Sequence, residues 1–212
     1  MAQLHRDRIK RAGGQLAEVG LTLTHIEAPL GAPKGTFIFD MRDAKTGEQL
    51  AYFEKDNIIT RDAGIAAAAH FKGDLTGGLK MLAIGTGATG NLLSPDAPQA
   101  TQRSLNNEIE RKAFASTTYR TTEGVAVSYR TNIVDFTTTY AESEAVGALN
   151  EMGLLVPASI NPATKNPINN GPSDYDPTID VSGMDLLVNY LTFAVISKPA
   201  TAVLSITWRL TF

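Results

Sequence analysis

The last eleven residues, AVLSITWRLTF, constrain the fold of this chain more than any other stretch. Apolar residues occupy every second position from Leu204 to Phe212, and serine, threonine or arginine occupies the positions between them. This period of two is typical of a half-buried β-strand, because successive side chains of a strand point to opposite faces. Trp208, the only tryptophan of the chain, lies on the apolar face. We therefore predict that residues 202–212 form a strand that completes a sheet and that Trp208 anchors the core beneath it.

Length and composition limit the classes of protein to consider. With 212 residues, 43% of them hydrophobic, the chain suits one domain that buries a substantial core. A net charge of −3 argues against a general nucleic-acid binder, which usually carries a basic excess. The absence of cysteine excludes disulfides, thiol nucleophiles and thiolate metal sites. No apolar run reaches the roughly 18 residues that a membrane span needs, and the charged N-terminal sequence is unlike a signal peptide. We expect a soluble protein made in a cytoplasm.

The first 14 residues read as a basic arm. They contain four lysine or arginine residues against one aspartate and end in two glycines. Such an arm could bind nucleic acid or an acidic protein surface, although a solvated, frayed terminus is the more common behaviour. We predict an N-terminal arm over residues 1–14 and a single β-rich domain over residues 15–212.

Alternating patterns predict strands along most of that domain. Residues 36–54 are expected to form a hairpin, because two alternating runs flank a turn that ends in Gly47. The strands at 185–196 and 202–212 are separated only by a short turn, so we predict that they form an antiparallel pair. Further strands are predicted at residues 21–27, 79–84, 116–121, 125–136 and 151–156.

Two segments predict short helices. The first begins after Thr60, a residue able to cap a helix, with Asp62 in its first turn and an alanine run that ends near residue 73. The second covers residues 104–114, whose apolar spacing is compatible with an amphipathic helix carrying Glu108 and Lys112 as an i, i+4 pair. The sequence thus predicts a mainly β protein, an antiparallel β-sandwich with one or two short helices and long loops.

A proline-rich loop is predicted over residues 157–184. Prolines recur every five residues from 157 to 177, and asparagine, glycine or aspartate precedes the last four. These pairs form turns, and loops of this length inside a domain are usually functional or disordered. Asp174, Asp176 and Asp180 could offer oxygen ligands to calcium, but the EF-hand glycine and glutamate are missing, so we favour a solvated acidic loop.

Residues 85–90, GTGATG, match the G-x-G-x-x-G pattern of dinucleotide-binding units directly after a predicted strand. That chemistry requires a helix to begin within the motif, and Pro95 and Pro98 stand where the helix would run. We therefore interpret the segment as a loop, and the hypothesis of an enzyme depends on this match alone. The three histidines, which lack any zinc-site spacing, are His5, His25 and His70. We expect no catalytic, cofactor-binding or metal-binding residues and no cofactor.

Several short fragments gain weight from their order along the chain. They are NIIT at residues 57–60 with Gly64 shortly after, LAIGTG at 82–87, Leu105 with Glu108 and Arg111, EMGLL at 151–155, and the closing residues 205–212. Over residues 55–212 this series resembles a family of structural proteins from the tail, neck, collar or baseplate region of tailed bacteriophages. The resemblance implies a β-rich virion subunit that functions in multiple copies and has no enzymatic site. The basic arm and the five-proline loop depart from the family pattern.

Two functional hypotheses follow. The first is a structural subunit of a phage virion, made in the host cytoplasm, that forms homo-oligomers and contacts other virion proteins. We expect it to bind no small-molecule substrate and no membrane, and its charge disfavours nucleic acid as a partner. The arm at 1–14 and the loop at 157–184 would make contacts between subunits. The alternative is a carbohydrate-binding module at a tail tip, in which Tyr119, Tyr129 and Tyr140 stack on sugars.

Overall fold

A computed structural model describes residues 33–74, 77–158, 178, 180 and 183–212, together with the backbone of residues 8–10 and 16–18. The chain divides into two compact units, Met1–Ala32 and Pro33–Phe212. In the first unit, strand β1 (Arg8–Lys10) pairs antiparallel with β2 (Leu16–Glu18). The predicted strand at 21–27 and most of the predicted loop at 157–184 lie outside the described residues. The division between residues 14 and 15 stays a prediction.

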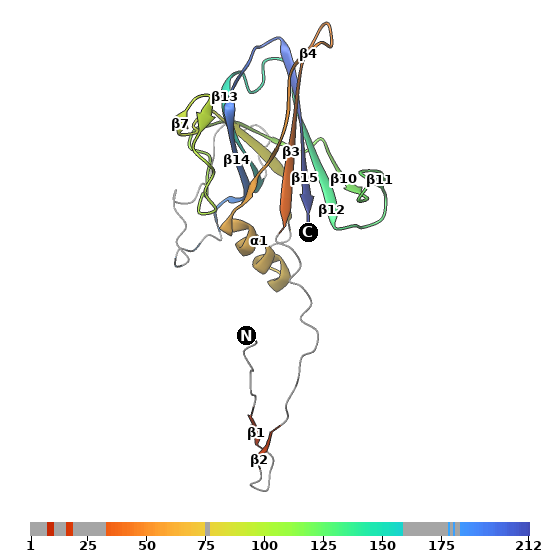
Figure 1. Cartoon of the computed structure of the whole chain (residues 1–212), viewed down its shortest axis with the longest axis vertical. Coiled ribbons are helices and arrows are strands. Elements are labelled where there is room, and N and C mark those ends of the chain that lie inside the picture. Colours follow the sequence, from red (N-terminus) through yellow and green to blue (C-terminus); the bar gives the residue numbers. More distant parts are fainter. Residues whose placement is uncertain are drawn as a thin grey trace. The chain divides into compact units, whose positions relative to one another are not determined.

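Six antiparallel strands form the first sheet of the second unit (Figure 1). They are β3 (Lys34–Asp43), β4 (Gln49–Asp56), β10 (Ser116–Arg120), β11 (Ala126–Val127), β12 (Ile133–Tyr140) and β15 (Ala202–Thr211). Their order is β11-β10-β12-β15-β3-β4, so the closing strand lies in the interior of the sheet. The predicted strand at the end of the chain is confirmed, and buried and half-buried residues alternate along its whole length.

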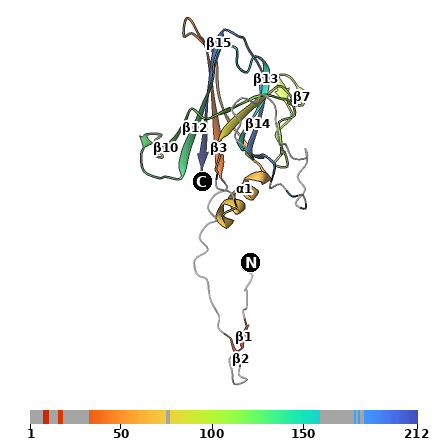
Figure 2. The ribbon, with the colours of Figure 1, turned by 180° about the vertical axis from the view of Figure 1, so that it is seen from behind.

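Five further antiparallel strands form the second sheet, in the order β5-β14-β13-β6-β9. They are β5 (Ile58–Ile59), β6 (Met81–Gly85), β9 (Glu108–Ala113), β13 (Gly147–Val156) and β14 (Leu186–Lys198). A small ladder joins β7 (Gly90–Asn91) to β8 (Ser94–Pro95). The two large sheets form separate layers that pack on each other (Figures 1 and 2), and the predicted β-sandwich is confirmed.

The main core fills the space between these two sheets. Trp208 is fully buried there, and its ring meets Phe37 edge-on with a centroid distance of 5.2 Å. Phe193 of the second sheet stacks on Phe37 at 6.4 Å, which ties the two layers together. Aromatic rings bury large apolar areas and favour such edge-on or offset contacts. The prediction that Trp208 anchors the core is confirmed.

The predicted pairing of residues 185–196 with 202–212 is wrong. β14 pairs with β13 and β5, whereas β15 pairs with β12 and β3, so the turn at 199–201 carries the chain from one sheet to the other. The cause lies in how the two strands are covered. β14 is buried on both faces from Leu186 to Phe193, while β15 keeps one face half-exposed. A strand that is apolar on both faces needs cover on both sides, which the second sheet provides.

That cover includes helix α1 (Arg61–Lys72), the one helix of the described residues. Ala66 on α1 packs with Val156, Leu186 and Val188 of the second sheet. The predicted first helix is therefore confirmed, and it ends at Gly73 in the left-handed conformation (φ 88°). Thr60 occupies the N-cap position, but its hydroxyl donates to the carbonyl oxygens of Leu187 and Val188 instead of capping the helix.

The predicted second helix at residues 104–114 is wrong, because this segment enters the second sheet as β9. The predicted Glu108–Lys112 pair does not form. Glu108 instead forms an ion pair with Arg111, and the Nζ of Lys112 lies 2.5 Å from Oε2 of Glu144. The charged residues at 108, 110 and 111 are buried in this strand. The prediction of a helix had assumed that such residues face the solvent.

The remaining strand predictions agree with the structure in outline. The hairpin at 36–54 is confirmed as β3 and β4, and its turn is closed by Asp43, whose Oδ1 accepts hydrogen bonds from the backbone N–H of Lys45 and Thr46. Strands at 79–84 and 151–156 correspond to β6 and β13. The run at 125–136 is divided between β11 and β12, both of which pair with β10. The described part of the chain has no helix long and apolar enough to cross a membrane.

Candidate functional site

The glycine-rich segment after β6 surrounds a buried carboxylate. Glu151 on β13 has no exposed surface, and its Oε1 accepts the backbone N–H of Gly87 at 2.9 Å and that of Asn107 at 2.7 Å. Its Oε2 accepts the N–H of Asn106 at 3.0 Å and the hydroxyl of Tyr190 at 2.7 Å. Burial, followed by the neighbouring Glu151, raises the pKa of Tyr190 far above its usual range, so this hydroxyl remains a donor. Four donors thus converge on one carboxylate.

The glycines make this approach possible. A Cβ at Gly87 would lie 2.3 Å from the backbone nitrogen of Asn107 and 2.6 Å from Glu151 Oε1. A Cβ at Gly85 would meet Asn107 O at 2.5 Å and Glu151 Oε1 at 2.6 Å. In a dinucleotide site such glycines admit a phosphate. Here they admit an internal carboxylate, and β7 follows in place of a helix. The N–H of Gly87 is therefore already occupied.

A polar pocket of about 460 Å³ opens beside this carboxylate. Tyr190 and Thr192 of β14 are nearly buried and line its inner side. The rest of the lining comes from the loop between β6 and β9, including the polar side chains Asp96, Gln99, Gln102 and Asn106. The pocket lies on the outer side of the second sheet, next to the cluster in which Leu105 packs on Tyr190.

Hydrogen bonds hold the wall of this pocket in place. Asp96 donates its N–H to Thr89 O at 2.8 Å, and its own carbonyl oxygen accepts the hydroxyl of Thr192 at 2.8 Å. Gln102 Nε2 donates to Asn106 Oδ1 at 3.0 Å, and Asn106 Nδ2 donates to the carbonyl of the glycine at position 87 at 3.1 Å. The loop is therefore connected to the Glu151 carboxylate as well as to β14, and the pocket exists before any ligand enters.

A group of buried ion pairs also lies on the second sheet, and its charges are paired with one another. Arg111 binds Asp185 Oδ2 at 2.6 Å and Glu108 Oε2 at 2.8 Å, and all three residues are buried. Asp185 Oδ1 also accepts the N–H of Ala158 at 2.8 Å. Burial raises the pKa of Glu108, and the pairing with Arg111 opposes that rise. These groups join β9 to the two residues that flank the 159–184 segment.

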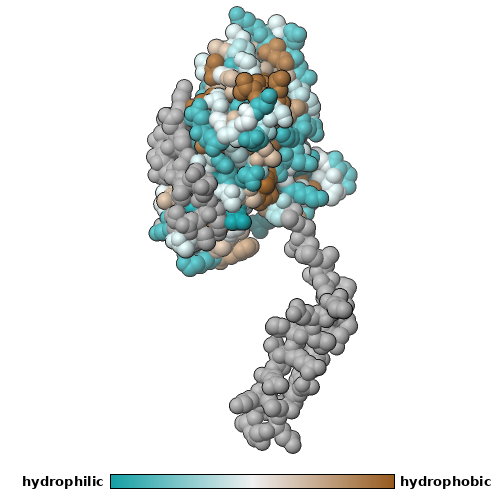
Figure 3. Space-filling model, turned by 60° about the vertical axis from the view of Figure 1, so that its left-hand side comes forward, coloured by the Kyte–Doolittle hydropathy of each residue, from teal (hydrophilic) through white to brown (hydrophobic). Residues whose placement is uncertain are grey.

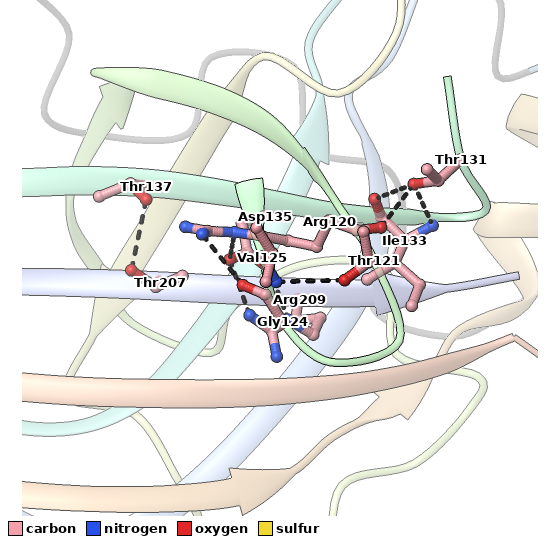
Figure 4. A network of polar contacts seen from close by, with 10 residues as sticks. All are labelled: Arg120, Thr121, Gly124, Val125, Thr131, Ile133, Asp135, Thr137, Thr207 and Arg209. Carbon is pink, nitrogen blue, oxygen red and sulfur yellow. Dashed lines mark hydrogen bonds and ion pairs between the residues drawn. The ribbon is translucent and has the colours of Figure 1, made fainter. Parts of the chain in front are cut away.

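A second polar network lies on the first sheet (Figure 4). Its Arg209 follows Trp208 directly on β15, so the network is on the face turned away from Trp208. The buried carboxylate of Asp135 accepts from Arg209 Nε at 2.7 Å and from Arg120 Nε at 2.8 Å. Arg120 also donates to Gly124 O at 3.2 Å, which holds the β10–β11 turn. Pairing with Asp135 raises the pKa of Arg209. Two arginines from different strands thus fix one carboxylate.

Candidate residues from the sequence are dispersed. Tyr140 is fully buried and donates its hydroxyl to Leu82 O at 2.8 Å, so the hypothesis that it stacks on sugars is wrong. Tyr129 is 62% exposed, and Tyr119 is half-buried beside a second pocket of about 340 Å³. Within the described ranges, no group of three or more histidine, aspartate or glutamate residues could hold a metal ion. Of the candidate calcium ligands, only Asp180 is described, and it is exposed.

Sequence reasoning missed both the Glu151 carboxylate site and the pocket. A signal was present in the segment EMGLLV, where one glutamate precedes five residues without a polar side chain in the second half of β13. A charge at such a position is buried and requires donors. The glycine-rich match 64 residues earlier supplied one of them.

The β7–β8 turn presents two adjacent leucines to solvent. Leu92 is 61% exposed and Leu93 is 77% exposed. The turn is rigid, because Leu92 O accepts the N–H of Val195 at 2.8 Å and Asn91 Oδ1 accepts the N–H of Leu93 at 2.8 Å. On the side of the domain that carries β7, apolar patches interrupt the hydrophilic surface (Figure 3).

No protein-family model matches the chain, and a search of curated proteins returns no significant match.

Proposed function

We propose that this protein is a structural subunit of a tailed-bacteriophage virion, from its tail, neck, collar or baseplate region. It is made in the host cytoplasm and carried in the particle. It assembles with copies of itself and with neighbouring virion proteins. The ordered series of fragments over residues 55–212 supports this role, and the β-sandwich agrees with the fold that the resemblance implies.

The observation that carries the assembly proposal is the leucine pair at the β7–β8 turn. Two adjacent large apolar side chains on a rigid turn expose surface that water solvates poorly. A mobile turn could fold such side chains back onto the domain, but the hydrogen bond from the N–H of Val195 on β14 to Leu92 O fixes the backbone of this one. Burial against another protein subunit removes that surface from water at little cost in conformational entropy.

Sedimentation velocity over a wide range of protein concentration tests this proposal. The wild-type chain is expected to form an oligomer as concentration rises, and the double variant Leu92→Asp/Leu93→Asp is expected to associate at least about tenfold more weakly. Phe71→Asp is the matched control, since Phe71 is equally apolar and even more exposed but lies on α1. A wild-type chain that stays monomeric at every concentration contradicts the proposal. Equal weakening in the control contradicts the role of the leucine pair.

A further inference from the structure

We propose that the polar pocket beside β14 binds a neutral, hydroxyl-rich ligand of the class of mono- and disaccharides. The inference does not rest on the proposed virion role. It also differs from the sugar-stacking hypothesis, because Tyr119, Tyr129 and Tyr140 take no part in it.

The charge of the pocket selects against anions. Among the described residues, no lysine, arginine or histidine lines it, and Asp96 is the one carboxylic acid that does. The carboxylate of Asp96 has no hydrogen-bond or ion-pair partner among the described residues, although its backbone is tied at both N–H and C=O. An anionic ligand would be repelled by that carboxylate, and no cationic side chain of the described lining would offset the repulsion. A hydroxyl of a neutral ligand can instead donate to the carboxylate.

The amide side chains complete a mixed set of donors and acceptors. Gln102 uses its Nε2 for Ser104 O and Asn106 Oδ1, which leaves its carbonyl oxygen available to a ligand. Asn106 commits one N–H to the Gly87 carbonyl, and Gln99 commits one to Ala97 O, so each retains a second N–H. Every sugar hydroxyl both donates and accepts. A ring of hydroxyls therefore matches a lining that offers carboxylate and amide oxygens as well as amide N–H groups.

Size and rigidity agree with this class of ligand. A volume of about 460 Å³ lies within the span of about 300–1,000 Å³ that small-molecule sites occupy. The wall is held by Thr192, by the Gln102–Asn106 bond and, through Asn106, by the Glu151 carboxylate. Because the Gln102 and Asn106 side chains and the backbone of Asp96 are fixed before binding, the ligand does not have to order them.

Titration by two-dimensional NMR tests the inference with the full chain. The probes are neutral hexoses, N-acetylhexosamines and their disaccharides, with sialic acid as an anionic probe and glucosamine as a cationic one. At least one neutral saccharide, at up to about 10 mM, is expected to shift the side-chain amide signals of Gln99, Gln102 and Asn106. Shifts from no neutral saccharide, or from glucosamine or sialic acid alone, overturn the inference.

Variants locate the site. Asp96→Ala is expected to weaken binding at least about tenfold, because it removes the charged acceptor and keeps the backbone bonds. Gln99→Ala is a second variant, which leaves the carboxylate in place and is expected to weaken binding by a smaller factor. Asp74→Ala is the control, since Asp74 is an exposed aspartate that does not line the pocket. Wild-type affinity in both pocket variants, with unchanged melting temperatures, overturns the inference. None of these outcomes depends on whether the chain oligomerises.

Discussion

Gly87 donates its backbone N–H to the buried carboxylate of Glu151, 64 residues away in the sequence, over 2.9 Å. This bond explains why a nucleotide-like glycine pattern occurs in a β-sandwich. The glycines allow close approach of an anion in both settings, but the anion here belongs to the protein. The loop from β6 to β9 is consequently built around a side chain of β13, and the polar pocket forms on that loop.

Gly87→Ala should lower the free energy of unfolding by about 1–3 kcal/mol, because the added Cβ would overlap backbone atoms of the 106–107 segment. Denaturation in urea measures the change. Gly78→Ala is the matched control, since nothing lies within 4 Å of a Cβ built at that glycine. Equal stability of the two variants would contradict the close packing at residue 87.

Glu151→Ala should cost about 3–5 kcal/mol, because it leaves several buried donors without an acceptor. Glu151→Gln, which keeps one acceptor oxygen, should cost less. Hydrogen exchange gives the local measurement. The amides of Asn106 and Asn107 are expected to be protected in the wild type and to exchange much faster in the alanine variant. Unchanged protection would show that the carboxylate does not hold the loop.

Trp208→Ala should destabilise the protein by about 3–5 kcal/mol, since it leaves a large cavity between the sheets. Trp208→Phe should cost less because a ring remains against Phe37. Thr207→Ala, one residue earlier on the opposite face of the same strand, serves as the control and should cost less than about 1 kcal/mol. An unchanged melting temperature for Trp208→Ala would refute the role of Trp208 as core anchor.

Asp62 should make stability depend on pH. Burial raises its pKa above 3.8, and Arg103, whose Nε lies 3.4 Å from Asp62 Oδ1, only partly opposes the rise. A raised folded-state pKa means that the folded protein binds this proton more tightly than the unfolded chain does. The contribution of Asp62 to stability is then fully present below pH 3.8 and is lost as pH rises through the folded-state pKa.

The comparison of wild type with Asp62→Asn isolates this effect. The stability of the wild type relative to the variant should decline as pH rises from about 3 to about 7. Carboxyls whose pKa is lowered, such as Asp40 and Glu144, act in the opposite sense but contribute equally to both proteins. Denaturant titrations at several pH values provide the data. A relative stability that increases with pH would reverse the assigned sign.

The closing strand could be predicted from the sequence because its alternation is a local property. Its partners could not, because pairing depends on segments far away, and the short turn at 199–201 favoured the wrong neighbour. The patterns did differ. Residues 186–193 are apolar with few interruptions, whereas 202–211 alternate strictly. A strand that is apolar on both faces must be packed on both sides, whereas an alternating strand needs packing on one side only. This difference between the two segments was the signal in the sequence against a hairpin.

The error at residues 104–114 has another cause. Glu108 and Arg111 have the spacing of a helical surface pair, yet both are buried in β9, where Asp185 supplies the third charge. That aspartate lies 74 residues away, so no local window can detect it. The pocket was missed for the same reason. Asp96, Gln99 and Gln102 occupy a loop of ordinary composition, and only the folded chain brings them beside Tyr190.

Mass spectrometry of purified phage particles, from cells that produce this chain, tests the proposed virion role most directly. Our account predicts that the chain co-purifies with the particles in several copies per particle and remains bound after high-salt washing. Its absence from intact particles, with the protein recovered only from the cell lysate, would contradict the account.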